Sequence, residues 1–344
     1  MHQKHSIEDK SIWLGIQSII GSLLLVLALG GCEEPMPQEL SGKHGALPTL
    51  GKPAQGVNLP SLEPVLMDGF ELDVHYGVNA RQTLDFWVAN PNEITPLVVY
   101  IHGGGFVAGC KKNMDLEVRD SLLAAGISVA SINYRFITTN PLPAPMLDAA
   151  RAIQFLREKG KSWRIDPERV AAMGGSAGAC IAMWIGLHDD MAIPGHPDPI
   201  RQQSTRLQAI AQNGGQSSLD PLWMQMWIPG GNTHLHENLP LGFGVENYKD
   251  LFDLSVRQKI IRMSPINHVS RDDPPIYMVY AGGNGPLPSN AEPAAGIHHR
   301  KFGVQLKRML DNADVEAVLV IGGEPRGTDP YGSRLEFLIQ KLLN

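Results

Sequence analysis

The chain has 344 residues, of which 43% are hydrophobic, and its formal net charge is −6 at pH 7. This length and apolar content suit one large folded core. The modest acidic charge, with no run of basic residues, argues against nucleic acid as a partner.

The first 31 residues have the pattern of a targeting segment. Lys4 and Lys10 precede an apolar run over residues 19–29, which ends in small residues. A short apolar run closed by small residues is typical of a signal peptide. An uncleaved membrane anchor, or cleavage at another position, are the alternatives. Residues 32–60 are rich in Pro and Gly and lack an apolar period, so they predict a flexible tether before a folded domain over 61–344.

Within the domain, apolar runs predict strands that alternate with helices. The predicted strands are 70–76, 82–88, 97–101, 127–133, 170–173, 207–212, 276–280 and 317–321, and the predicted helices are 116–125, 146–159, 177–187, 301–311 and 333–343. The first two strands alternate apolar and polar residues, which indicates antiparallel strands at a sheet edge. The rest predicts an α/β fold, in which a mostly parallel sheet carries helices on both faces.

Residues 220–267 interrupt this alternation. They are rich in Trp, Met and Leu and show no strand pattern. We expect a lid-like insertion that supplies apolar walls to a substrate cleft. The alternative is a segment that packs down and seals the core.

Two glycine-rich motifs carry the chemistry. Residues 174–178 read G-x-S-x-G between a predicted strand and a predicted helix, which is the order that a nucleophile elbow requires, and Ser176 is the candidate nucleophile. Residues 102–105 read His-Gly-Gly-Gly directly after a predicted strand, where unhindered N–H groups can form an oxyanion hole rather than a plain flexible turn. His102 itself is expected to brace this loop.

The two motifs together resemble those of α/β-hydrolases of the esterase and lipase group, in particular the hormone-sensitive-lipase and feruloyl-esterase-like branches. Residues 131–135 and 142–148 extend the resemblance, which runs from about Gly69 to the C-terminus. It implies an α/β-hydrolase fold, a small-molecule ester substrate and no cofactor. It also implies that the oxyanion donors are the N–H groups of Gly104, Gly105 and Ala177.

Residues 29–32 resemble a bacterial lipobox. This resemblance implies that Cys32 is acylated and becomes the first residue of the mature protein. The domain would then lie in the bacterial cell envelope, outside the cytoplasm, and be anchored to a membrane through its lipid.

The partners of the serine are missing from the positions where the resemblance places them. Asn284 stands at the usual acid position, and Pro325 or Arg326 stands where the histidine is expected. A serine hydroxyl is a poor nucleophile without a base within hydrogen-bond reach. Replacing the aspartate of a serine-protease triad by asparagine lowers kcat about 10⁴-fold.

A swapped arrangement can supply the base. His298 and His299 follow the penultimate strand and precede a helix, which places them at the same sheet edge as the elbow. We therefore predict that one of them is the base and that Asp329 or Glu324, after the last strand, orients it. In the alternative, the two histidines only begin a helix and face water.

These motifs predict a carboxylic ester hydrolase that works by acyl transfer through Ser176, on small or carbohydrate-linked esters. The alternative is a pseudo-hydrolase that binds a ligand or partner without turnover. No histidine pair has the spacing of metal ligands, so we expect no metal. Cys110 and Cys180 both fall near the two motifs, where they either form a disulfide or remain separate buried thiols.

Overall fold

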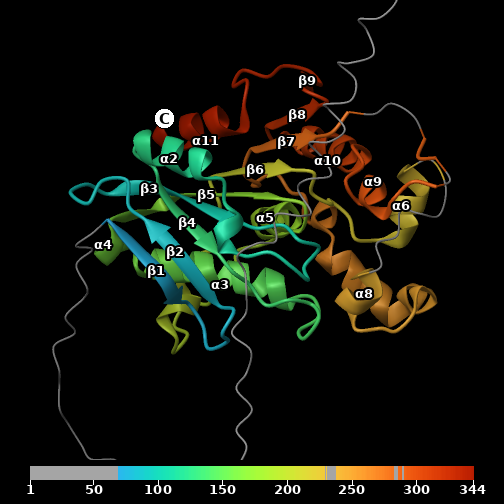
Figure 1. Cartoon of the computed structure of the whole chain (residues 1–344), viewed down its shortest axis with the longest axis horizontal. Helices are drawn as coiled ribbons and strands as arrows, with labels where there is room; N and C mark the ends of the chain where they lie inside the picture. The colour runs from blue at the N-terminus through green and yellow to red at the C-terminus, as the bar shows by residue number, and fades with distance from the viewer. Residues whose placement is uncertain (1–68, 229, 231–237, 283–285, 289) are drawn as a thin grey trace, which may run out of the picture. The chain divides into compact units, whose positions relative to one another are not determined.

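The computed structural model describes residues 69–228, 230, 238–282, 286–288 and 290–344. They form a nine-stranded sheet with the strand order β1-β2-β4-β3-β5-β6-β7-β8-β9 (Figure 1). The strands are β1 (Phe70–His75), β2 (Thr83–Trp87), β3 (Thr95–Ile101), β4 (Ser128–Ile132), β5 (Ile165–Gly175), β6 (Ala209–Asn213), β7 (Ile276–Tyr280), β8 (Ala317–Ile321) and β9 (Glu324–Pro325).

The middle of the sheet is parallel and its two edges are antiparallel. Strands β3 to β8 pair in parallel, whereas β1 and β2 at one edge and β9 at the other run against their neighbours. The carboxyl ends of the parallel strands therefore meet at one side of the sheet, where loops from distant parts of the chain come together.

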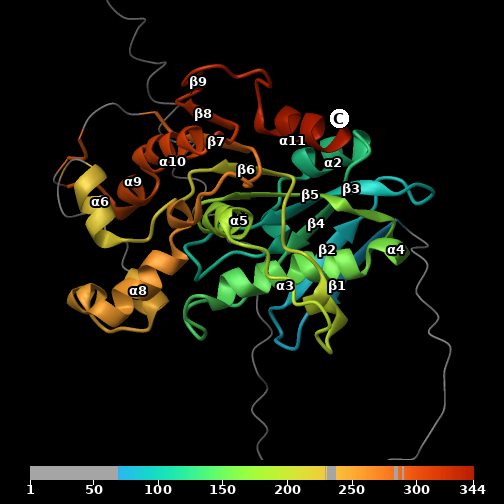
Figure 2. The ribbon, with the colours of Figure 1, turned by 180° about the vertical axis from the view of Figure 1, so that it is seen from behind.

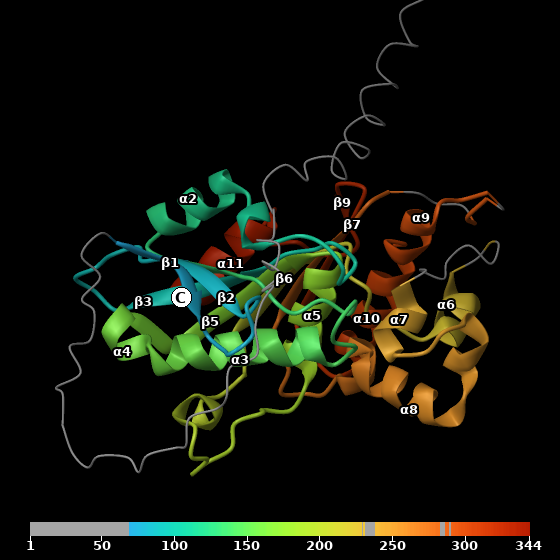
Figure 3. The same cartoon turned by 60° about the horizontal axis from the view of Figure 1, so that its bottom comes forward.

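Helices cover both faces (Figure 2). They are α2 (Leu116–Ala124), α3 (Ala144–Glu158), α4 (Gly160–Trp163), α5 (Ala177–Leu187), α6 (Pro221–Trp227), α7 (Asn238–Phe243), α8 (Leu254–Met263), α9 (Pro293–Ile297), α10 (Lys301–Asn312) and α11 (Arg334–Leu343). Helices α2 and α11 lie on one face, and α3, α5 and α10 lie on the other (Figure 3).

Each face of the sheet has its own apolar core, because alternate residues of a strand point to opposite faces. In β3, Leu97, Val99 and Ile101 join the larger core under α3 and α5, while Val98 joins the smaller core under α2 and α11. All four side chains are fully buried. The central strands are thus held from both sides, which fixes the ends that carry the site.

The structure confirms the predicted fold class, and each of the eight predicted strands is present. Strand β9 was not predicted, and the insertion over 220–267 forms helices α6, α7 and α8 together with short 3₁₀ turns. No helix in the described ranges is long and apolar enough to cross a membrane. The predicted signal peptide, Cys32 and the predicted tether lie outside the described residues.

Candidate active site

Ser176 occupies a strained turn between β5 and α5. Its φ is 52° and its ψ is −121°, which is an unfavourable backbone conformation for a residue with a side chain. The turn is held on both sides, because the Ser176 N–H donates to the Asn213 carbonyl at 2.9 Å and the Ser176 carbonyl accepts from the Cys180 N–H at 3.0 Å. The hydroxyl is thereby presented at the carboxyl edge of the sheet.

Glycines make this turn possible. A Cβ at Gly178 would lie 2.0 Å from the Ile101 carbonyl oxygen, and a Cβ at Gly174 would lie 2.7 Å from the same atom. Helix α5 therefore approaches the end of β3 at a distance that only glycine allows. This contact explains the spacing of the G-x-S-x-G motif.

The loop after β3 lies directly against the turn that carries Ser176. A Cβ at Gly103 would come within 2.9 Å of the Gly175 carbonyl oxygen, and Gly104 and Gly105 have positive φ values of 108° and 59°. Within the described part of the chain, the N–H groups of Gly104, Gly105 and Ala177 bond to no acceptor. Free donors on both sides of a serine are suited to bind a developing oxyanion.

His102 braces this loop from below. Its ring stacks on Tyr134 at 4.2 Å, and its Nδ1–H donates to the Gly103 carbonyl at 2.7 Å. The Tyr134 hydroxyl in turn donates to the His102 carbonyl at 2.8 Å. Burial lowers the pKa of His102 to about 3, so the ring is neutral at physiological pH.

The structure brings His298, and not His299, to the serine. His298 lies at the end of α9, and its Nε2 is 2.8 Å from the Ser176 hydroxyl oxygen. Its ring packs against the backbone of Gly214, where a Cβ would lie 3.4 Å from the His298 Cδ2 atom. His299 is buried, and its Nδ1 accepts from the Lys301 N–H at 3.2 Å.

The structure does not place either predicted orienting acid against His298. The Asp329 carboxylate accepts from the Tyr277 hydroxyl at 2.6 Å and from the N–H groups of Tyr331 and Gly332. Tyr277 belongs to the core under α11, on the face away from α10. Glu324 is exposed in β9. The prediction for these two carboxylates is therefore wrong, because the loop after β8 turns back along the sheet edge.

Pro325 and Arg326, which stand where the resemblance places the histidine, lie in that hairpin. Pro325 pairs with Val320, and the Arg326 N–H donates to the Leu319 carbonyl at 2.7 Å, so both residues belong to the β8–β9 hairpin. Asn284 lies outside the described residues.

A pocket with about 470 Å³ of empty space, its open mouth included, lies beside Ser176. Its walls are apolar apart from Ser176, Gln216 and Asn238. They come from the loop after β3, the segment before α3, the β5–α5 turn, the segment after β6, the 220–267 insertion and α9. The lining residues are Gly105, Phe106, Ile137, Leu142, Ser176, Gln216, Leu219, Met224, Asn238, Leu239, Gly242 and Ile297. The insertion also buries Met224 and Phe243 in the core, so it both lines the pocket and seals the domain.

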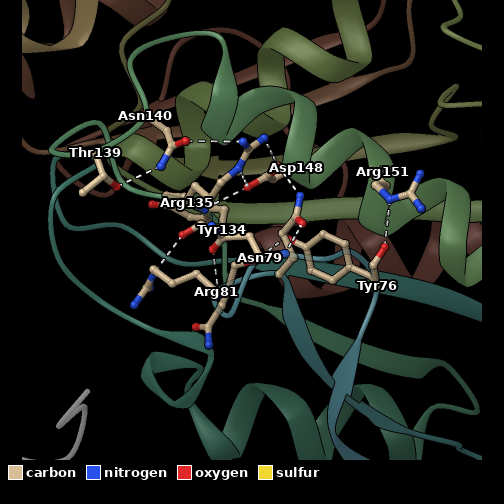
Figure 4. Close-up of polar contacts among 11 residues, drawn as sticks. Tyr76, Asn79, Arg81, Tyr134, Arg135, Thr139, Asn140, Asp148 and Arg151 are labelled. Atoms are coloured by element: carbon tan, nitrogen blue, oxygen red, sulfur yellow. Dashed lines mark hydrogen bonds and ion pairs between the residues drawn. The ribbon is translucent and has the colours of Figure 1, made fainter. Parts of the chain in front are cut away.

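An ion pair fixes one wall of this pocket (Figure 4). Asp148 is 1% exposed, and its carboxylate accepts from the Arg135 guanidinium at 2.6 and 2.8 Å and from the Gln82 side chain at 2.6 Å. The pair joins the two ends of the segment that carries Ile137 and Leu142. A fully bonded buried carboxylate of this kind rigidifies its surroundings.

Sequence reasoning missed this role, although Arg135 and Asp148 both fall within the motif segments. The signal was two opposite charges at either end of a Pro-rich stretch.

The last two features are the cysteines near the motifs and groups that could hold a metal ion. Cys180 is a buried free thiol, so it forms no bond with Cys110. Among the described residues, no cluster of three or more His, Cys, Asp or Glu side chains is arranged to hold a metal ion.

A nucleophile elbow after a central parallel strand, with a glycine oxyanion loop after its neighbour, defines an α/β-hydrolase. A family model described as BD-FAE matches residues 84–287, which is more than half of the chain. The chain belongs to the BD-FAE family.

Curated relatives match over shorter stretches. Esterase LipI of Mycobacterium tuberculosis is 35% identical over 133 residues, covering 36% of this chain and 41% of LipI. Carboxylesterase NlhH of the same organism is 33% identical over 167 residues, covering 45% of this chain and 52% of NlhH. The chain thus spans about half, or less, of the length of these relatives.

Solved structures share the fold at low identity. A truncated carbohydrate esterase from gut microbiota superposes with a TM-score of 0.60 at 20% identity, covering 80% of this chain and 96% of that one. Propionate-bound Est2 of Thermogutta terrifontis superposes with a TM-score of 0.55 at 20% identity, covering 81% and 95% of the two chains. At this identity the likeness shows the α/β-hydrolase fold alone.

Proposed function

We propose that the protein is a serine carboxylesterase that works by acyl transfer through Ser176, with His298 as the base. The observation that carries the proposal is the 2.8 Å distance between His298 Nε2 and the Ser176 hydroxyl oxygen. A nucleophile and a base within hydrogen-bond reach are the minimum requirement of this chemistry. The esterase names of the relatives agree with it.

The geometry supports a two-step reaction. His298 takes the proton of Ser176 as its oxygen attacks the ester carbonyl, and the N–H groups of Gly104, Gly105 and Ala177 stabilise the oxyanion. His298 then gives the proton to the leaving alcohol, and an acyl-enzyme remains. Water activated by the same imidazole attacks the acyl-enzyme, which releases the acid and restores the serine.

The chemistry of the pocket indicates which half of the ester it binds. Its lining is mostly apolar and it lies beside Ser176, so we assign it to the acyl group of the substrate. The alcohol half then lies toward solvent, where a small alcohol or a carbohydrate can be accommodated. A small or carbohydrate-linked ester of a short apolar acid is the substrate that this arrangement favours.

Hydrolysis of p-nitrophenyl acetate tests the proposal. We expect Ser176→Ala and His298→Gln each to lower kcat by at least about 10³-fold, because neither the nucleophile nor the base can be replaced by its neighbours. His299→Gln is the matched control and should retain most of the activity.

An active Ser176→Ala variant, or a loss in His299→Gln as large as that in His298→Gln, would overturn the assignment. A folded wild-type protein that is inert toward a panel of acyl esters would instead support the pseudo-hydrolase alternative.

A further inference from the structure

A second hollow lies between α10 and the β8–β9 edge of the sheet. We call it the cationic groove and define it by the charged side chains that line it, which are Arg300, Lys301, Lys307, Arg308, Asp311 and Arg326. Its other lining residues are Asn312, the half-buried Val304, and Leu319 and Ile321, which are each only 3% exposed. The groove is a shallow hollow open to solvent, with about 1060 Å³ of empty space when the open part is included.

The groove is strongly positive within an acidic protein. It carries five cations and one carboxylate, whereas the whole chain has a net charge of −6. The carboxylate is already paired, because Lys307 Nζ lies 2.8 Å from the Asp311 Oδ1 atom. Within the described residues, no carboxylate pairs with Lys301, Arg308 or Arg326. A hollow lined by charges of one sign concentrates the field and attracts counter-ions.

The groove begins next to the catalytic site. In the turn between α9 and α10, Ile297 lines the acyl pocket, His298 contacts Ser176 and Arg300 lines the groove. Three residues of chain span at most about 10 Å. Figure 1 shows α9 and α10 in succession at this end of the sheet. A ligand in the groove can therefore reach the site.

We propose that the cationic groove binds a polysaccharide that carries carboxylate groups, such as a chain of uronic acid units. Cations on both the α10 side and the β9 side suit carboxylates spaced along a chain, and the half-buried Val304 between them offers an apolar contact to a sugar ring. The 12-residue helix α10 is about 18 Å long, which leaves room for several sugar rings. A flat anionic membrane would contact protruding side chains rather than a hollow.

This inference extends the proposed function, since the bound polysaccharide would be the alcohol half of the ester, but binding itself does not depend on turnover. The competing explanation is that the cations only keep the short edge strand β9 from pairing with other chains. That explanation predicts no affinity for a soluble polyanion.

Affinity electrophoresis of the full-length chain in gels that contain polygalacturonate tests the proposal. We expect wild type to be retarded, with a dissociation constant that rises at least tenfold in the double variant Arg308→Glu, Arg326→Glu and that also rises with salt. Lys249→Glu, Lys259→Glu is the control, because it makes the same change in net charge at exposed lysines of the insertion. It should bind as wild type does after correction for free mobility.

Binding by Ser176→Ala, ester hydrolysis by the groove variant and binding to lipid vesicles complete the test. Ser176→Ala should bind polygalacturonate as tightly as wild type, which separates a failed groove from a failed esterase. Hydrolysis of p-nitrophenyl acetate should be equal in wild type and the groove variant. No retardation of wild type, an equal loss in the control variant, or binding to phosphatidylglycerol vesicles without binding to polygalacturonate would each overturn the proposal.

Discussion

Two histidines of the site have opposite environments and therefore opposite roles. His298 reaches the nucleophile from the turn after α9, where its Nε2 lies 2.8 Å from the Ser176 hydroxyl. His102 is fully buried beneath the oxyanion loop, and its Nε2 has no hydrogen-bond partner among the described residues. Because its Nδ1 donates to a carbonyl, a second proton on the ring would be buried without an acceptor. One imidazole is placed to exchange protons, and the other is held neutral.

His102 should make the folded protein sensitive to acid. The pKa of His102 is about 3 in the folded protein, whereas the ordinary pKa of histidine is 6.5. Between pH 3 and pH 6.5 the unfolded chain therefore binds more protons than the folded protein. The contribution of His102 to stability is complete above pH 6.5 and falls as the pH is lowered, by up to about 1.4 kcal/mol per pH unit.

Urea unfolding curves at pH 7 and pH 5 test this. We expect the free energy of unfolding to fall between these pH values by about 2 kcal/mol less in His102→Gln than in wild type. The exposed His75 provides the control variant, His75→Gln, whose pH dependence should follow that of wild type. Parallel curves for wild type and His102→Gln would contradict the prediction.

At the scale of elements, the sequence predicted the regular sheet well and the insertion poorly. Helix α5 and strands β7 and β8 have the predicted bounds, because glycine, proline and strong apolar runs mark their ends. Helices α6 to α8 were not predicted, since short apolar segments do not reveal their period. The pair His298 and His299 was predicted as the source of the base, but only the fold of the α9–α10 turn distinguishes them.

The prediction that Asp329 or Glu324 orients the base was wrong because of how the segment after β8 folds. The local signal for this loop was the Gly322-Gly323 pair, whose positive φ values of 62° and 84° form the two-residue turn of a hairpin, and the prediction did not use it. In the structure this loop forms the β8–β9 hairpin and places Asp329 against Tyr277.

Helix α7 gives the acyl pocket part of its width. Gly242 lines the pocket, and a Cβ there would lie 3.5 Å from Leu142 Cδ1 and 3.6 Å from Ile137 Cδ1, which is ordinary contact. The Leu142 N–H donates to the Gly242 carbonyl at 2.8 Å, so the two walls cannot easily separate. Gly242→Ala should therefore fold at least as well as wild type, because alanine is favoured in helices, while it narrows the pocket.

We expect Gly242→Ala to lower kcat/KM for p-nitrophenyl esters of longer acids about tenfold or more relative to the acetate. Leu241→Ala, at an exposed position of the same helix, should keep the wild-type preference. An unchanged dependence on acyl length in Gly242→Ala, with the enzyme active, would show that the acyl group lies elsewhere.

At the scale of the whole molecule, the domain depends on two cores separated by one sheet. The pocket and His298 belong to the side of α5 and α10, whereas Phe337 of α11 anchors the smaller core on the other side. Anchoring through Cys32, which lies outside the described residues, stays a prediction.

Phe337→Ala should separate stability from catalysis. Phe337 is fully buried between Tyr277 and Tyr331, and removing such a ring costs about 3–5 kcal/mol, which lowers Tm by roughly 6–20 °C. Kinetics at 25 °C should remain close to wild type, as should the Tm of the control Leu343→Ala at the exposed end of α11. A large loss of kcat in folded Phe337→Ala would show that the two cores are coupled.

The position of His298 also determines where the amino-acid sequence can change without affecting the proposed reaction. In the proposed mechanism the base reaches Ser176 from the turn before α10, so the reaction uses no group from the loop after β8. Glu324 and Gly327 in that loop are exposed, and nothing lies within 4 Å of a Cβ placed at Gly327. An exposed position such as Glu324 can therefore change while the chemistry stays intact, whereas the φ of 107° at Gly327 favours glycine there. Substrate recognition at this end of the sheet can therefore diversify, in nature or by design, independently of turnover.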